Sequence, residues 1–194
     1  ETDLGSYYSD MGNSPMLQSI IKIHMFQIAY TLHVLQKKFP GFKHNDLHIG
    51  NVLVKLDRDF DKIDILHIKY NKYVIGKTSY YMPYFGNVIK IIDFGFAVHD
   101  TCPNAGASNN IIKHFRQSPD YCLYMTTLYN KFNSTSSIVE LLAELDPSGI
   151  HRYPSQIAIG MEAHKFPTID AILNNPIWTE YKSPQTNILN IYTA

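Results

Sequence analysis

Two aspartates and an asparagine are the residues of this chain whose types and spacing could carry out chemistry. Asp46 and Asn51 lie within one short polar segment, and Asp93 follows a run of β-branched residues further along the chain. An aspartate can handle a proton, whereas a second aspartate and an asparagine offer the hard oxygen atoms that Mg2+ prefers. Magnesium-dependent phosphoryl transfer needs such a set, because it depends on positioning and charge neutralisation more than on covalent help.

Strands and tight loops are expected to position these three side chains. Residues 52–55 predict a short strand directly after Asn51, and Gly50 allows tight backbone geometry just before it. Residues 88–92 predict a second strand that leads into Asp93. Asn51 and Asp93 should therefore meet at the same end of a small sheet.

A long buried helix is expected ahead of the polar segment. Ser14 followed by Pro15 is a helix-start signal, an N-cap and then a proline at the first helical position. Apolar residues then recur at three- and four-residue steps as far as Leu35, and Pro40 with Gly41 should end the helix. Because its other faces are also apolar, we expect it to be the central helix of its domain.

A β-rich insert separates the two predicted strands. It covers residues 63–82, and Gly76 with Lys77 is a two-residue hairpin signal within it. Helical signals return after the second strand. Three further helices are expected, over residues 121–132, 137–145 and 169–174.

Composition limits the classes of protein to consider. The 194 residues are 45% hydrophobic and suffice for one domain. Seventeen Lys plus Arg balance seventeen Asp plus Glu, so we expect neither nucleic acid nor a membrane as a partner. No apolar run approaches the length of a membrane span. Cys102 and Cys122 are too few for a disulfide framework, so we expect a reducing compartment, cytoplasmic or nuclear.

The segment from His44 to Asn51 resembles the catalytic loop of the protein kinase superfamily, which is His-Arg-Asp-Leu, three variable residues and Asn. The segment Asp93-Phe94-Gly95 matches that family's metal-binding Asp-Phe-Gly. The resemblance implies an α+β, mainly α fold, the carboxyl-terminal lobe of a kinase. Such a lobe would contain a central buried helix, a small β-sheet that carries the catalytic and Asp-Phe-Gly loops, and here a β-hairpin insert.

The resemblance also implies roles for the residues that match. Asp46 would accept or orient the proton of the attacking hydroxyl, and His48 stands where conventional kinases carry a lysine near the transferred phosphate. Asn51 and Asp93 would hold the Mg2+ ions that bridge the phosphates of ATP.

Four other residues would support this site. Phe94 and Gly95 complete the cofactor-binding motif, and His44 would support its backbone. Asp120 is similar to the kinase aspartate that fixes the catalytic-loop backbone from below, although an ordinary helix-cap role fits it equally well.

The β-rich insert narrows the resemblance. Conventional kinases connect the catalytic Asn to Asp-Phe-Gly by a short segment, whereas here a predicted hairpin intervenes. In this respect the chain looks like haspin-type kinases and like the kinase-like proteins of large DNA viruses. The hairpin would be either a surface decoration or a site for a substrate or partner.

The resemblance covers residues 14–181, preceded by a hinge-like lead-in over 1–13 and followed by a tail over 182–194. A glycine-rich loop and a Val-Ala-Ile-Lys strand do not precede the long helix, so the amino-terminal lobe would come from a missing upstream segment or from another chain. Asn45 replaces the family's arginine, so control by activation-loop phosphorylation is not expected.

Three functions follow from these observations. The first is a serine/threonine protein kinase that uses ATP and Mg2+ to phosphorylate a protein, in a host cell or a virion if the chain is viral. The second is a pseudokinase or virion component that keeps the fold for protein contacts only. The third is a small-molecule kinase, whose loops also use Asp-Leu-His and Asn.

Overall fold

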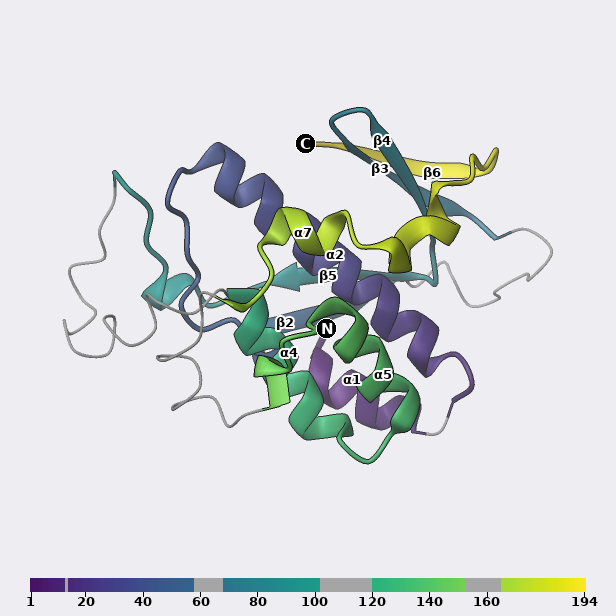
Figure 1. Cartoon of the computed structure of the whole chain (residues 1–194). Helices are drawn as coiled ribbons and strands as arrows, with labels where there is room; N and C mark the ends of the chain where they lie inside the picture. The colour runs from purple at the N-terminus through teal and green to yellow at the C-terminus, as the bar shows by residue number, and fades with distance from the viewer. Residues whose placement is uncertain (13, 58–67, 102–119, 153–164) are drawn as a thin grey trace.

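The long helix α2 (Leu17–Lys38) lies at the centre of the chain, with two three-stranded sheets and the shorter helices arranged around it (Figure 1). This arrangement is seen in a computed structural model, which describes residues 1–12, 14–57, 68–101, 120–152 and 165–194. The predicted central helix is confirmed. More than half of its residues are buried, including Phe26 and Ile28, which are fully enclosed.

The start of α2 differs from the sequence prediction. Ser14 does not cap the helix; its hydroxyl accepts a hydrogen bond from the N–H of Met16 at 3.3 Å, and its carbonyl accepts one from Leu17 at 3.0 Å. Ser14 therefore closes a turn, and the helix begins only at Leu17. The end agrees with expectation, since Lys37 and Lys38 occupy the last turn and favour the negative end of the helix dipole.

The first sheet has the order β1-β2-β5 and is antiparallel throughout. Its strands are β1 (Thr2–Asp3), β2 (Val52–Leu56) and β5 (Asn87–Ile91). The strands predicted over 52–55 and 88–92 are confirmed as β2 and β5, and they pair directly with each other.

The hinge-like lead-in predicted over residues 1–13 contains regular structure instead. Its first residues form β1, and they continue into helix α1 (Leu4–Met11). The carboxylate of Asp3 caps this helix by accepting a hydrogen bond from the N–H of Ser6 at 2.9 Å. Leu4 and Tyr8, four positions apart on one face, are fully buried. These two residues of the lead-in therefore belong to the core.

The second sheet contains the insert and has the order β4-β3-β6. Strands β3 (Tyr70–Ile75) and β4 (Thr78–Pro83) form the predicted hairpin, which turns through Gly76 at φ +57°. Strand β6 (Ile188–Thr193) pairs in parallel with β3, so the predicted tail over 182–194 is part of this sheet. The first residues of the predicted insert, 63–67, lie outside the described residues.

The three predicted shorter helices are confirmed within a residue or so at each end. The structure has α4 (Asp120–Phe132), α5 (Ser136–Leu145) and α7 (Ile169–Leu173). Among the described residues there are also four 3-10 segments: η1 (Ile49–Asn51), η3 (Phe94–Phe96), η4 (Ile150–Arg152) and η6 (Pro176–Lys182). Within the described ranges, no helix is both long and apolar enough to cross a membrane.

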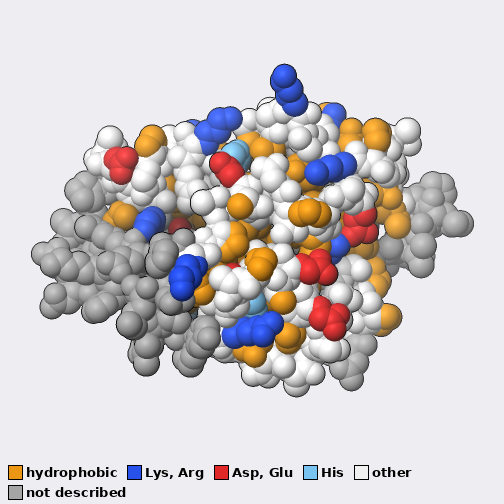
Figure 2. Space-filling view, viewed as in Figure 1, with side chains coloured by type: hydrophobic (Ala, Val, Ile, Leu, Met, Phe, Trp, Pro, Cys, Tyr) orange, Lys and Arg blue, Asp and Glu red, His pale blue; other side chains and the backbone are white. Residues whose placement is uncertain are grey.

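An aromatic cluster joins the insert to α2. The ring of Phe26 meets those of Tyr73, Tyr80 and Trp178 at centroid distances of 5.4, 5.0 and 5.3 Å. The Tyr80 hydroxyl donates a 2.8 Å hydrogen bond to the carbonyl of Leu173, so the hairpin is also tied to α7. On the face shown in Figure 2, acidic and basic side chains are interspersed, in keeping with the balanced charge of the sequence.

Candidate catalytic and metal-binding site

The candidate site lies where the segment before β2 meets the segment after β5. Asn51 ends η1 and leads into β2, and Asp93 lies two residues beyond the end of β5. The N–H of Ile92 donates a 3.0 Å hydrogen bond to the carbonyl of Asn51, which extends the β2–β5 pairing to this end of the sheet. The two predicted oxygen donors are thus brought to neighbouring strand ends.

Asn51 holds Asp46 in place. Its Nδ2 donates to the backbone carbonyl of Asp46 at 2.9 Å and to the Oδ2 of the same residue at 3.2 Å. Asn51 is buried, whereas 30% of the Asp46 side chain is exposed. A carboxylate held at one oxygen and open to solvent can accept a proton from a bound hydroxyl group.

His48 lies beside this carboxylate with its ring in a defined orientation. Its Nδ1 accepts a 3.1 Å hydrogen bond from the N–H of Gly50, so Nε2 carries the proton of the neutral ring. That Nε2 is 3.9 Å from the Oδ2 of Asp46. A side chain at position 50 would approach the Cε1 of His48 to 2.9 Å, which explains why glycine fits there.

Asp93 begins a short 3-10 turn and takes an uncommon backbone conformation. Its φ is +60°, in the left-handed region, and its Oδ1 accepts a 3.3 Å hydrogen bond from the N–H of Gly95. The carboxylate is exposed. The next residue, Phe94, is 47% exposed, and its ring packs against the ring of His44 at a centroid distance of 5.0 Å.

His44 connects the two segments of the candidate site, 44–51 and the residues around Asp93. It is fully buried, and its Nε2 donates a 2.8 Å hydrogen bond to the carbonyl of Ile92, the residue before Asp93. Its Nδ1 has no hydrogen-bond partner among the described residues. The side chain therefore bridges segment 44–51 and the backbone immediately before Asp93.

Asp120 fixes the backbone at the start of segment 44–51. Its two carboxylate oxygens accept hydrogen bonds from the N–H groups of His44 at 2.8 Å and Asn45 at 2.9 Å. Burial raises the pKa of the Asp120 carboxyl, and the two N–H donors act against that shift. Asp120 is also the first residue of α4, so this helix is joined to the site.

Asn45 has a positioning role that the sequence analysis missed. Its φ is +65°, and its Nδ2 donates a 2.8 Å hydrogen bond to the carbonyl of Phe96. The signal was present, because asparagine is among the few residues that readily adopt a left-handed backbone. Thr127 was also missed; its hydroxyl accepts a 3.2 Å hydrogen bond from the N–H of Ile49.

The donor set of Asn51 and Asp93 fits Mg2+. The amide nitrogen of Asn51 donates to Asp46, so the amide oxygen Oδ1 is the atom of this side chain that could bind the metal. Asp93 keeps Oδ2 besides the oxygen that bonds Gly95. Amide and carboxylate oxygens are preferred Mg2+ ligands. No group of three or more His, Cys, Asp or Glu is arranged for a metal in the described part of the chain.

Comparison with known proteins finds relatives over part of the chain. A protein of Acanthamoeba polyphaga mimivirus, named as a candidate serine/threonine-protein kinase, is 39% identical over 77 residues, 39% of this chain and 16% of the relative. A second mimivirus protein with the same description is 36% identical over 75 residues, 38% of this chain and 17% of the relative.

A third relative comes from a cellular organism. A Dictyostelium discoideum protein, also named as a candidate serine/threonine-protein kinase, is 32% identical over 126 residues, 60% of this chain and 9% of the relative. This chain spans less than a fifth of the length of each of the three. No family model and no solved structure matches it. Part of this chain is therefore related to proteins named as serine/threonine-protein kinases.

Proposed function

We propose that this chain is the carboxyl-terminal lobe of a serine/threonine protein kinase that transfers a phosphoryl group from ATP to a protein hydroxyl with the aid of Mg2+. The observation that carries the proposal is the double role of Asn51. Its side chain holds Asp46, and its carbonyl bonds the backbone next to Asp93. Asn51, itself a proposed metal ligand, thus joins the proposed base to the backbone beside Asp93, the other proposed ligand. The partial similarity to named kinases supports the same function.

Each side chain has a defined task in this proposal. Asp46 accepts or orients the proton of the substrate hydroxyl, because its carboxylate is fixed at one oxygen and exposed to solvent. The Nε2–H group of His48 lies beside the carboxylate of Asp46. There it would donate a hydrogen bond to the negatively charged phosphoryl group during transfer. Asn51 and Asp93 would hold Mg2+, which neutralises charge on the nucleotide phosphates.

Within kinases, we assign the chain to the haspin-like and large DNA virus group. The support is the hairpin β3–β4, which lies between Asn51 and Asp93 in the sequence, and the two mimivirus relatives. The amino-terminal lobe, with its glycine-rich loop, would be supplied by further sequence or by another chain. A protein substrate remains part of the proposal.

A transfer assay tests this function. The longest protein that its gene encodes is incubated with Mg2+ and ATP labelled at the γ-phosphate, with a panel of proteins and a panel of small alcohols as acceptors. We expect Mg2+-dependent labelling of serine or threonine in proteins. Labelling of the alcohols alone would favour a small-molecule kinase. Absence of both transfer and Mg2+-ATP binding would favour an interaction protein without catalysis.

A further inference from the structure

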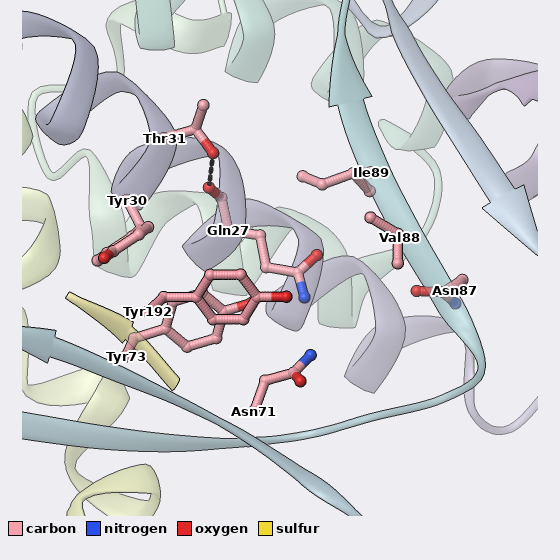
Figure 3. Close-up of a pocket in the computed structure, with 9 residues that line it drawn as sticks. All are labelled: Gln27, Tyr30, Thr31, Asn71, Tyr73, Asn87, Val88, Ile89 and Tyr192. Carbon is pink, nitrogen blue, oxygen red and sulfur yellow. Dashed lines mark hydrogen bonds between the residues drawn. The ribbon is translucent and has the colours of Figure 1, made fainter. Parts of the chain in front are cut away.

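A second site is formed by a cavity of about 120 Å3 between α2, β3, the start of β5 and β6 (Figure 3). Its nine lining residues all belong to the described ranges, and none comes from segments 44–51 or 93–95. Val88 and Tyr192 line the cavity and are 44% and 37% exposed, so the cavity borders the molecular surface at both residues. The cavity is thus open to solvent and separate from the candidate catalytic residues.

A buried amide oxygen without a hydrogen-bond partner lies beside this cavity. Gln27 is 7% exposed, and its Oε1 has no hydrogen-bond partner among the described residues. Figure 3 shows the side chain leaving α2 toward β5, with the amide oxygen directed to the side of Val88. A buried carbonyl oxygen without a partner loses its hydration and gains nothing in return. A ligand that carries an N–H group would satisfy it.

A donor lies on the opposite wall. Asn71 is 3% exposed, and its Oδ1 accepts a 3.0 Å hydrogen bond from the Nδ2 of Asn190. Its own Nδ2 is the other end of the amide and points toward the NH2 group of Gln27 in Figure 3. One of its two N–H bonds has the hydroxyl of Tyr73 as a partner, and the second is the donor available to a ligand. The cavity therefore presents an acceptor from α2 and a donor from β3, the pair that a ligand with both an N–H and a carbonyl would match.

The charge and shape of the cavity restrict the ligand further. The lining residues, all within the described part of the chain, are amides, a threonine, tyrosines and aliphatic residues, and burial raises the pKa of Tyr73 so that it stays neutral. A charged ligand would find no counter-charge there. The rings of Tyr73 and Tyr192 stack at 4.8 Å and 12°, which makes one wall flat.

The volume selects a single ring. A cavity of roughly 150 Å3 inside a protein binds benzene, so the space measured here suits a molecule with one six-membered ring. We propose that this cavity binds a small, neutral, planar ring with an amide-type N–H next to a carbonyl, as in a pyrimidine base. The N–H donates to the Oε1 of Gln27, and the carbonyl accepts from the Nδ2 of Asn71. The site does not depend on phosphoryl transfer.

Two probes with the same ring and the same carbonyls test the proposal on the unaltered chain. Uracil offers N–H groups beside its carbonyls, whereas 1,3-dimethyluracil has the same carbonyls and no N–H. Binding is followed by NMR through the side-chain amide signals of Gln27 and Asn71. We expect uracil to bind with a Kd on the order of 1 mM and the dimethyl compound at least about tenfold more weakly. Equal binding of both probes would overturn the proposal. Binding of neither probe would also overturn it and would mean that water alone fills the cavity.

A pair of variants on the same helix locates the site. Gln27→Met removes the amide with little change of length, and Gln18→Met makes the same change at an exposed position of α2. We expect Gln27→Met to weaken uracil binding about tenfold and Gln18→Met to leave it unchanged. Uracil binding that survives Gln27→Met contradicts the site. If Gln27→Met does not fold, the comparison of the two probes decides alone.

Discussion

Nε2 of His44 lies 2.8 Å from the carbonyl oxygen of Ile92, so a buried ring joins segment 44–51, the proposed catalytic segment, to the backbone that leads from β5 into Asp93. The same residue is held at its backbone N–H by Asp120. Three elements, the catalytic segment, β5 and α4, are therefore tied together at one histidine. Changes at this point should affect stability and site geometry together.

Asp46→Asn should reduce phosphoryl transfer by roughly a hundred- to ten-thousandfold, because the amide cannot accept the proton of the attacking hydroxyl. The replacement keeps the shape of the side chain, so folding should change little. The rate at saturating Mg2+-ATP measures the effect in the protein that shows transfer activity. Asp10→Asn, at an exposed position of α1, is the matched control. Near-normal transfer by Asp46→Asn would rule out Asp46 as the base.

Asp120→Asn should lower the free energy of unfolding by about 1 to 3 kcal/mol. The new amide can accept only one of the two backbone hydrogen bonds from His44 and Asn45, and its NH2 group would face the other N–H. Urea unfolding measures the loss. The control Asp10→Asn should stay within about 0.5 kcal/mol of the unaltered chain. An equal effect of both replacements would mean that Asp120 does not hold the catalytic segment.

Tyr80→Phe should cost about 1 to 2 kcal/mol of stability. The hydroxyl of Tyr80 is buried and donates a hydrogen bond to the carbonyl of Leu173. Removal of the hydroxyl takes this hydrogen bond away from the carbonyl. The adjacent Tyr81→Phe is the control, because Tyr81 is only partly buried and its ring contacts Lys72. Thermal or urea unfolding of the two variants should separate them; equal stabilities would show that the link between hairpin and α7 contributes little.

The stability of the chain should fall below neutral pH because of His24. Burial lowers its pKa to about 4, although the hydrogen bond to Asn87 acts in the opposite direction. The unfolded chain has an ordinary histidine pKa of about 6.5 and binds the proton first. The contribution of the neutral ring is therefore complete above pH 6.5 and is lost as the pH falls toward 4, at a cost of about 3 kcal/mol.

The measurement compares urea unfolding at pH 7 and pH 4 for the unaltered chain and for His24→Gln. Carboxylates titrate in both proteins, so the difference between their pH dependences isolates the histidine. The variant should lose about 3 kcal/mol less over this interval. Identical pH dependences would show that His24 is not held in its neutral form by the fold.

The sequence predicted elements whose signals are local. The apolar periodicity of α2, the hairpin turn at Gly76 and the strand before Asp93 were all recognisable without the structure. Helix α1 was missed because only Leu4 and Tyr8 mark its buried face among polar neighbours. Strand β6 was missed because it depends on pairing with β3, which no local pattern reveals.

The proposed catalytic site and the cavity at Gln27 also differ in how far the sequence reveals their residues. The residues of the catalytic segment are close in sequence, so a motif could point to them before any contact was known. The bonds that hold this segment to the rest of the chain, such as that of Asn45 to the carbonyl of Phe96, required the structure. The cavity at Gln27 draws its lining from four separate elements, and no spacing in the sequence joins them.

The parallel pairing of β3 with β6 also affects how the chain reaches its fold. Asn71 and Asn190, whose side chains bond across these strands, are 119 residues apart in sequence. During synthesis the β3–β4 hairpin would leave the ribosome long before β6, the third strand of the sheet, has been made. Until then the edge of β3 that pairs with β6 would remain unpaired. Closing so long a loop is slow, and an unpaired edge attracts other strands. The interval before β6 arrives is therefore the stage at which newly made chains would be most prone to aggregate.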